Sequence, residues 1–350
     1  MKIIVLHLLS SNRFSGAENV AIQIISGFKE FDTIDMYYCS PDGSIREYLE
    51  GKSVKYIGLE KLSIAKIKKV IKTIKPTIIH AHDMRASLLA SIAAPHITLI
   101  SHIHNNHYEA RGISLRSIAY TLPGIIAKHI FWVSKAAYDG YIFHKLFQKK
   151  SSILLNVINV DDLKYKVSED TKNYNYDVVY LGRLTDQKNP QRLIKVLQLA
   201  CTMNENLKIA IVGDGDLRDE VLTLIRDYNL SNNIDYLGFI NNPYKILSSS
   251  KLMIMTSRYE GLPMCSLEAM SLGIPVVSTR TDGLKEIISS GIDGILDDDD
   301  FVLASSINKI VTDTEYQQYL SKNAKSKAQS LMDFNSYIHN IAVVYDFSTL

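Results

Sequence analysis

Residues 177–190 read Asp177-Val178-Val179-Tyr180-Leu181-Gly182-Arg183-Leu184-Thr185-Asp186-Gln187-Lys188-Asn189-Pro190. The first five residues are mostly β-branched, aromatic or aliphatic, and they predict a short strand that ends at Gly182. Beyond Pro190, apolar residues recur with helical spacing as far as Ala200 and predict a helix. Strand, basic loop and helix in this order are typical of an α/β protein with a parallel sheet.

The same alternation extends along the chain and predicts two doubly wound, Rossmann-like domains. Residues 159–176 are polar and charged with little periodicity, so we place the domain boundary there, with domains at 1–160 and 161–333. The tail from Phe334 is expected to be helical. The strands expected in the first domain are 3–8, 35–39, 45–49, 54–57, 77–80, 98–103 and 130–133, and the helices are 17–28, 64–74 and 85–94.

Arg183 and Lys188 follow the strand at 177–181, at the sheet edge where open parallel sheets bind ligands. Two fixed cations there would suit a diphosphate. A nucleoside diphosphate gains negative charge as it leaves, so these cations would stabilise the transition state more than the substrate. The alternative is a pair of solvated surface charges.

A second informative segment is Glu260-Gly261-Leu262-Pro263-Met264-Cys265-Ser266-Leu267-Glu268. Pro263 suits the first turn of a helix, and Gly261 can adopt conformations closed to other residues. Glu260 then precedes the helix and Glu268 lies inside it. A helix N-terminus offers unpaired N–H groups that favour a phosphate, so two acids beside it suggest a sugar nucleotide. The alternative is a solvated Glu260 and a Glu268 that pairs with a neighbour.

These segments, with others in the same order, resemble the retaining glycosyltransferase family 4 of the GT-B fold. The blocks that carry the resemblance are Gly182-Arg183 with Lys188-Asn189, Gly213-Asp214-Gly215, Leu237-Gly238-Phe239, Glu260-Gly261-Leu262-Pro263 with Glu268-Ala269, Gly273-Ile274-Pro275-Val276-Val277, and Gly291 to Gly294. Weaker matches in the first half are Ser15-Gly16-Ala17-Glu18, His80-Ala81-His82 and His102-Ile103-His104-Asn105.

The resemblance implies an acceptor-binding domain at 1–160, a donor domain at 161–333 and a final helix, 334–350, that crosses back to the first domain beside an interdomain cleft. It implies that Arg183 and Lys188 bind the donor diphosphate, that Glu268 binds the ribose and that Glu260 binds the transferred sugar. Together these matches predict a donor site formed by Gly16, Arg183, Lys188, Gly213, Phe239, Glu260, Gly261, Leu262 and Glu268.

Three histidines, His102, His104 and His107, follow or end the expected strand 98–103. Alternation places His102 and His104 on one face, where we expect them to face the ligand. The family has a histidine here that contacts the donor sugar; His104, before Asn105, is the better match and His102 the second choice. The predicted catalytic set is therefore Glu260, His104, Arg183 and Lys188.

Metal binding has two candidate patterns. His80, His82, His102 and His104 could form a cluster at adjacent strand ends, but no thiolate accompanies them. Asp214-Gly215-Asp216 matches the Asp-x-Asp pattern of metal-dependent glycosyltransferases, although the family resemblance makes it a turn near the nucleotide. We therefore expect no metal and no cofactor, with the nucleoside diphosphate sugar as co-substrate.

The net charge of +2 hides an asymmetry, because residues 1–160 hold 20 Lys/Arg and 11 Asp/Glu, whereas residues 161–350 hold 19 and 26. Lysines are densest at 66–75, which suggests contact with acidic lipids or a lipid-linked pyrophosphate; the alternative is a helix whose apolar side packs on the sheet. Apolar runs are too short for a membrane span and no signal peptide is evident. We expect a cytoplasmic protein with peripheral contact at the inner face of the membrane, and no nucleic-acid binding.

The three cysteines are widely spaced and suggest neither a disulfide framework nor a zinc site. The function predicted by the residues and the resemblance is retaining transfer of a sugar, from a UDP-sugar by preference, to a glycan or lipid-linked acceptor in capsule, O-antigen or exopolysaccharide synthesis. Alternatives are a non-catalytic sugar-nucleotide-binding subunit, or an epimerase or hydrolase of the same fold. A nicotinamide oxidoreductase lacks its glycine fingerprint after the first strand.

Overall fold

The computed structural model describes residues 2–50, 52, 54–104 and 108–347. The chain divides into two compact units: unit 1 comprises Met1–Asn156 and Phe334–Leu350, and unit 2 comprises Val157–Asp333. The division falls after Asn156 rather than at residue 160, and the segment from Phe334 groups with the first unit.

Unit 1 has, within the described residues, a seven-stranded parallel sheet in the order β3-β2-β1-β4-β5-β6-β7. Its strands are β1 (Ile3–Leu8), β2 (Ile34–Pro41), β3 (Lys55–Leu59), β4 (Ile78–Ala81), β5 (Thr98–Ile103), β6 (His129–Trp132) and β7 (Ser151–Ile153). Its helices are α1 (Gly16–Gly27), α2 (Ile45–Leu49), α3 (Ile64–Ile74), α4 (Met84–Ala93), α5 (Leu115–Ile126), α6 (Lys135–Asp139) and α15 (Phe334–Val344), with 3₁₀ turns at Tyr108–Arg111 and His144–Lys150.

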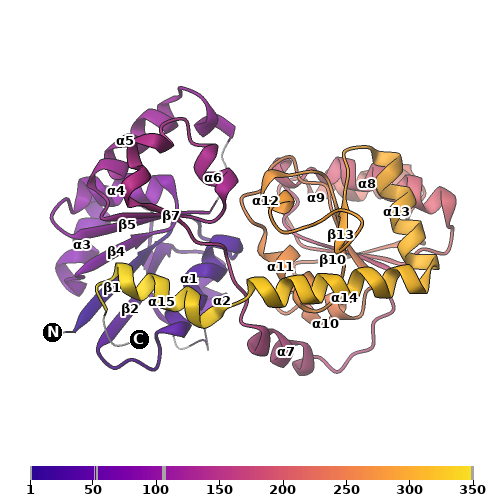
Figure 1. The fold of residues 1–350 in the computed structure, drawn as a ribbon, viewed down its shortest axis with the longest axis horizontal. Coiled ribbons are helices and arrows are strands. Elements are labelled where there is room, and N and C mark those ends of the chain that lie inside the picture. Colours follow the sequence, from indigo (N-terminus) through magenta and orange to yellow (C-terminus); the bar gives the residue numbers. More distant parts are fainter. Residues whose placement is uncertain (1, 51, 53, 105–107, 348–350) are drawn as a thin grey trace. The chain divides into compact units, whose positions relative to one another are not determined.

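The sheet of unit 1 is covered on both faces, as its nearly continuous apolar strands require. Figure 1 shows α3, α4 and α5 on one face and α1 with α15 on the other. The C-terminal segment belongs to this core, because the Tyr345 hydroxyl hydrogen-bonds His80 Nδ1 at 2.6 Å and the Tyr345 ring lies 5.7 Å from that of Phe28.

Unit 2 has, in its described residues, a six-stranded parallel sheet in the order β10-β9-β8-β11-β12-β13. Its strands are β8 (Val178–Leu181), β9 (Ile209–Val212), β10 (Ile234–Gly238), β11 (Leu252–Met255), β12 (Val276–Ser278) and β13 (Gly294–Leu296). Its helices are α7 (Val160–Glu169), α8 (Pro190–Met203), α9 (Arg218–Asp227), α10 (Tyr244–Ser248), α11 (Met264–Ser271), α12 (Asp282–Lys285), α13 (Asp300–Thr312) and α14 (Thr314–Leu331), with a 3₁₀ turn at Asp186–Lys188.

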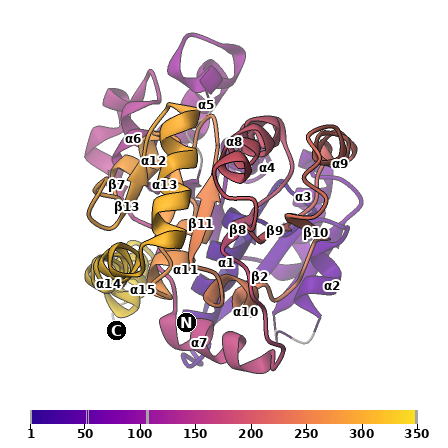
Figure 2. The same cartoon turned by 90° about the vertical axis from the view of Figure 1, so that its right-hand side faces the viewer.

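Helices also enclose the second sheet, with α8, α9 and α13 on one face and α10, α11 and α14 on the other (Figures 1 and 2). In both units the strand order reverses direction beside the first strand, between β1 and β4 in unit 1 and between β8 and β11 in unit 2. Such a switch point is where doubly wound sheets bind ligands, because the loops diverge there. The expected pair of Rossmann-like domains is confirmed.

Two local predictions are wrong. Residues 45–49 form helix α2 rather than a strand, because Ile45, Tyr48 and Leu49 are buried at helical spacing. The stretch 159–176, expected as a linker, contains α7. This helix buries only Leu163, so its periodicity is weak, but Asn159 caps it by accepting a hydrogen bond from Asp162 N.

One boundary also differs from expectation. Pro263 is the residue before α11 rather than part of its first turn. Helix α13 begins at Asp300, and Asp299 before it accepts hydrogen bonds from Phe301 N and Val302 N. Among the described residues, no helix has both the length and the apolar character that crossing a membrane requires.

Candidate donor-binding site

The loops after β8 and β11 meet at the switch point of unit 2. Backbone and side-chain hydrogen bonds join them: Arg258 N donates to Gln187 O at 2.8 Å, and Gln187 Nε2 donates to Tyr259 O at 3.1 Å. The Thr256 hydroxyl donates to Asn189 O at 3.1 Å. Because these bonds hold both loops in one arrangement, the side chains they carry are prepositioned at the sheet edge.

Lys188 and Glu260 form an ion pair between these two loops, with Lys188 Nζ 2.6 Å from Glu260 Oε1. Their side chains are only 12% and 6% exposed. Burial by itself lowers the pKa of Lys188, but the charge and hydrogen bond of Glu260 outweigh it and leave this pKa above its ordinary value. Lys188 is therefore charged at neutral pH. A lysine ammonium has three N–H donors, so two remain for a ligand.

Arg183 lies on the same β8 loop and is exposed. The Tyr180 hydroxyl donates to the Arg183 carbonyl at 2.9 Å, which fixes the backbone there. Within the described part of the chain, the guanidinium of Arg183 has neither an ion pair nor a hydrogen bond. Glu260 neutralises the charge of Lys188. Arg183 therefore adds a positive charge to the loop after β8 that this ion pair does not balance.

Glycines allow the neighbouring strand ends to approach one another closely. Gly213, after β9, has φ +138°, and a Cβ at this position would lie 1.9 Å from the carbonyl oxygen of Gly182. Gly213 N donates to Gly238 O at 2.8 Å and so connects the ends of β9 and β10. Phe239, the residue after Gly238, is 60% exposed. A large aromatic side chain thus lies in solvent at the same edge of the sheet.

Helix α11 begins after the loop that follows β11, and it has no side-chain cap at its N-terminus. Its first N–H groups therefore have no capping acceptor from Pro263. Leu262 is buried in the core, and the Gly261 carbonyl packs so closely on Gly283 that a Cβ at Gly283 would lie 1.9 Å from it. What this segment offers an anion is therefore backbone N–H groups rather than side chains.

Glu268 lies inside α11 and is 6% exposed. Its Oε1 accepts a hydrogen bond from the Tyr244 hydroxyl at 2.9 Å. Burial raises the pKa of Glu268 to about 7, although Tyr244 and the charge of Lys166 both act to lower it. A buried carboxyl that titrates near neutrality is typical of a functional site rather than of a stabilising pair.

The remaining predicted residues belong to unit 1. Gly16 is the first residue of α1, next to Ser15, whose hydroxyl donates to the buried carboxylate of Glu18. His104 follows β5, and its Nε2 lies 2.9 Å from His82 Nδ1. His102, on β5 itself, is completely buried.

Asn105 and His107 lie outside the described residues. Tyr244 and His7 were not predicted as site residues, although the sequence contains a signal for each. Tyr244 begins a helix of unit 2. His7 is the one polar residue in the apolar strand expected at 3–8.

Two Rossmann-like units with charged loops at the switch point of the second sheet define a doubly wound α/β protein, of the kind that binds ligands at its strand ends. Residues 161–327 match the family model described as Glycosyl transferases group 1, and this match lies within unit 2. The solved structure of Anabaena HepE in complex with UDP-glucose superposes with a TM-score of 0.85, covering 98% of this chain and 99% of that one at 21% identity. This likeness confirms the expected GT-B fold.

Curated relatives are glycosyltransferases as well. An uncharacterized glycosyltransferase of Methanocaldococcus jannaschii is 30% identical over 64% of this chain and 60% of its own length. The capsular polysaccharide biosynthesis glycosyltransferase CapH of Staphylococcus aureus is 25% identical over 99% of both chains. The UDP-Gal:alpha-D-GlcNAc-diphosphoundecaprenol alpha-1,3-galactosyltransferase of Escherichia coli is 25% identical over 93% of this chain and 92% of its own. The chain spans 44% to 60% of the length of the first four curated relatives that it matches.

Proposed function

We propose that this chain is a retaining hexosyltransferase that moves a sugar from a nucleoside diphosphate sugar, with a UDP-sugar preferred, to a hydroxyl of a glycan or lipid-linked saccharide. The observation that carries the proposal is the buried Lys188–Glu260 pair, which bridges the β8 and β11 loops at the switch point beside the unpaired Arg183. It offers cations for a diphosphate and a carboxylate for sugar hydroxyls within one hydrogen-bonded unit.

The diphosphate is bound by Arg183, by the two remaining donors of Lys188 and by the N–H groups at the start of α11. These charges stabilise the leaving nucleoside diphosphate as the glycosidic bond breaks, which lowers the barrier rather than merely strengthening binding. Since this set supplies positive charge from side chains, donor binding requires no metal ion and no cofactor.

The nucleoside is recognised further along the same edge. Glu268 accepts hydrogen bonds from the ribose hydroxyls, and the exposed ring of Phe239 offers a face on which the base can stack. Gly213 allows the ends of neighbouring strands to lie close together at this edge, because a Cβ at Gly213 would occupy the space of the Gly182 carbonyl.

Glu260 orients the transferred sugar. Glu260 already accepts a hydrogen bond from Lys188, which lowers its nucleophilicity, so a covalent glycosyl-enzyme is disfavoured. Front-face attack, with a leaving phosphate oxygen accepting the proton of the acceptor hydroxyl, retains the anomeric configuration. Retention is tested by the anomeric NMR signal of the product formed from an α-linked donor.

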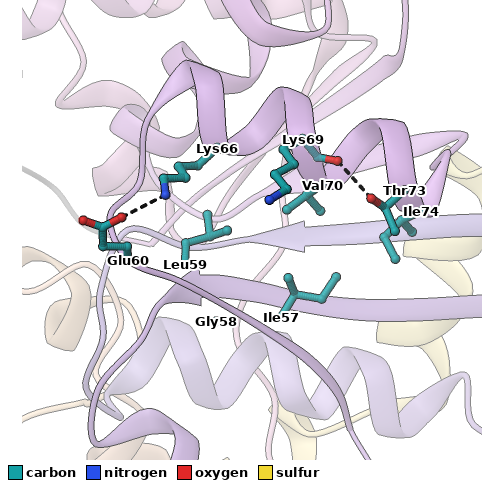
Figure 3. A pocket seen from close by; sticks show the side chains of 9 residues that line it. All are labelled: Ile57, Gly58, Leu59, Glu60, Lys66, Lys69, Val70, Thr73 and Ile74. Carbon is teal, nitrogen blue, oxygen red and sulfur yellow. Dashed lines mark hydrogen bonds and ion pairs between the residues drawn. The ribbon is translucent and has the colours of Figure 1, made fainter.

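The acceptor is proposed to bind unit 1 at the inner face of the membrane, where surface polysaccharide precursors are assembled. Helix α3 buries Ile67 and Val70 against the sheet, which confirms that its apolar side packs inward, and keeps Lys68, Lys69 and Lys72 in solvent. A groove of about 360 Å³ lies between this helix and β3. Figure 3 shows Lys66 and Lys69 on the helix side of the groove, close to the apolar side chains that line it. The relatives with capsular and diphosphoundecaprenol acceptors in their names support this setting.

The deciding experiment is calorimetry with UDP, GDP, ADP, CMP and TDP in EDTA, on wild type and on Glu268→Ala and Arg183→Ala. Binding of one nucleotide that both substitutions weaken supports the donor site and narrows the base. If no nucleotide binds, the proposal fails and a non-catalytic subunit becomes the better account. Incubation with the donor sugar alone tests the other alternative, because an epimerase or hydrolase forms product without an acceptor.

A further inference from the structure

Five imidazoles lie together at the switch point of unit 1. His7 comes from β1, His80 and His82 come from β4 and the residue after it, and His102 and His104 come from β5 and the residue after it. The ring centroids of His102 and His104 are 4.1 Å apart, and those of His80 and His82 are 4.5 Å apart. Four of the five are at most 1% exposed, and His104 is half-buried.

The hydrogen bonds among these rings are incomplete. His82 is the centre of a chain, with Nε2 2.9 Å from His7 Nδ1 and Nδ1 2.9 Å from His104 Nε2. By contrast, among the described residues, His7 Nε2, His80 Nε2, His104 Nδ1 and both ring nitrogens of His102 are buried without a partner. A buried nitrogen without a partner is unfavourable, so five of them in one cluster favour the binding of a further group there.

The chemistry of these side chains limits which ion they could bind. A neutral imidazole carries a lone pair on one ring nitrogen. Neutral imidazole is the preferred ligand of zinc, copper, nickel and cobalt, whereas magnesium and calcium require oxygen.

We propose that His82, His102 and His104 bind one divalent transition-metal ion. One nitrogen from each of the three lies within 4.8 Å of the others, so modest side-chain movements bring them to the roughly 2.0–2.1 Å that zinc–imidazole bonds need. The ion replaces the hydrogen bond between His82 Nδ1 and His104 Nε2. His82 then carries its proton on Nε2 and donates it to His7 Nδ1, the outer hydrogen bond that ligating histidines usually make.

His102 distinguishes this triad from the alternative set His7, His80 and His82, which shares His82 and also has ligand atoms within 4.8 Å of one another. His80 is held by the Tyr345 hydroxyl, whereas His102 has no partner in the described residues on either nitrogen. His7 and His80 already have one hydrogen-bond partner each, whereas an ion at the first triad gives His102 a partner that the described residues do not supply. The site uses only residues of unit 1, so it is separate from the metal-independent diphosphate binding proposed for unit 2.

The test is titration of tag-free, chelator-stripped protein with Co²⁺, followed by displacement with Zn²⁺. We expect one equivalent to bind and to give the intense visible absorption of four-coordinate cobalt, together with a rise in the melting temperature. Wild-type protein that binds no cobalt, or that gives only the weak spectrum of six-coordinate cobalt, overturns the proposal without any variant.

Variants then assign the ligands. His102→Gln is expected to abolish the cobalt spectrum, while His80→Gln retains it, and the exposed histidines substituted in His96→Gln and His339→Gln serve as matched controls. UDP binding to unit 2 and the circular dichroism spectrum report whether each variant is folded. Loss of the spectrum in His80→Gln but not in His102→Gln contradicts the assignment, as does equal loss in a control.

Discussion

In the proposed donor site, Glu268 should make nucleotide binding depend on pH, and its burial gives the direction. Its pKa is about 7 because the carboxyl is buried, whereas ribose hydroxyls donate hydrogen bonds and therefore favour the ionised form. If only ionised Glu268 binds, the competent fraction is about 90% at pH 8 and about 10% at pH 6, so the apparent Kd rises about tenfold between them.

Calorimetry measures this effect directly. UDP is titrated at pH 6, 7 and 8, and at pH 6.5 in two buffers of different ionisation enthalpy, where we expect release of about 0.8 proton from Glu268. The nucleotide phosphate itself titrates in this range, so Glu268→Gln, which cannot ionise, is the matched control. A pH profile that is the same in wild type and Glu268→Gln refutes the assignment of Glu268 to the ribose.

The same pKa predicts a stability difference in the absence of ligand. The folded pKa of about 7 lies above the ordinary value of 4.5, so the folded chain binds the proton more tightly and loses stability as the pH rises from 4.5 to 7. The loss is about 3 kcal/mol at pH 8. Glu268→Gln is therefore expected to melt roughly 6–12 °C higher than wild type at pH 8 and at a similar temperature at pH 4.

Other substitutions separate binding from stability. Arg183→Ala is expected to weaken UDP binding by about 2 kcal/mol, or roughly thirtyfold, with an unchanged melting temperature, because the guanidinium is exposed and unpaired among the described residues. Lys188→Met should lower the free energy of unfolding by about 3–5 kcal/mol, since it leaves Glu260 buried and charged, and adding Glu260→Gln should recover part of that loss in denaturant titrations. Gly213→Ala should prevent stable folding, whereas Gly238→Ala, also at positive φ but with open space around its Cβ position, should cost only about 1 kcal/mol; equal melting temperatures would contradict this reading.

The sequence predicts most of the fold because the parallel strands are short apolar runs with polar loops after them. Strand 98–103 and helix 64–74 are predicted with the same limits that the structure shows. Prediction fails where an element buries few residues, as in α7, or where a short apolar segment fits either period, as in α2. These segments are decided by capping and tertiary packing, which local patterns record weakly.

The site is predicted less completely, and the reason is physical. Strand order places Lys188 and Glu260 at one edge, but an ion pair between them depends on loop hydrogen bonds that no spacing rule contains. In the same way, alternation puts His102 and His104 on one side of β5 without revealing that this side is filled by His7 and His80. Position along a strand therefore predicts which residues lie at the sheet edge, but not how deeply each side chain is buried.

In the proposed donor site, the Lys188–Glu260 pair would contact both the diphosphate and the sugar of the donor. One donor of Lys188 is committed to Glu260 and two are left for phosphate, so the pair need not break when a nucleotide binds. The unshared Glu260 oxygen then accepts from the sugar, and Glu260→Gln should weaken UDP-glucose, UDP-galactose and their N-acetyl forms while it leaves free UDP bound within a fewfold of wild type. Competition calorimetry measures both affinities in each protein. A variant that loses UDP and UDP-sugars equally would show that Glu260 acts only by holding Lys188, and that the sugar is recognised elsewhere.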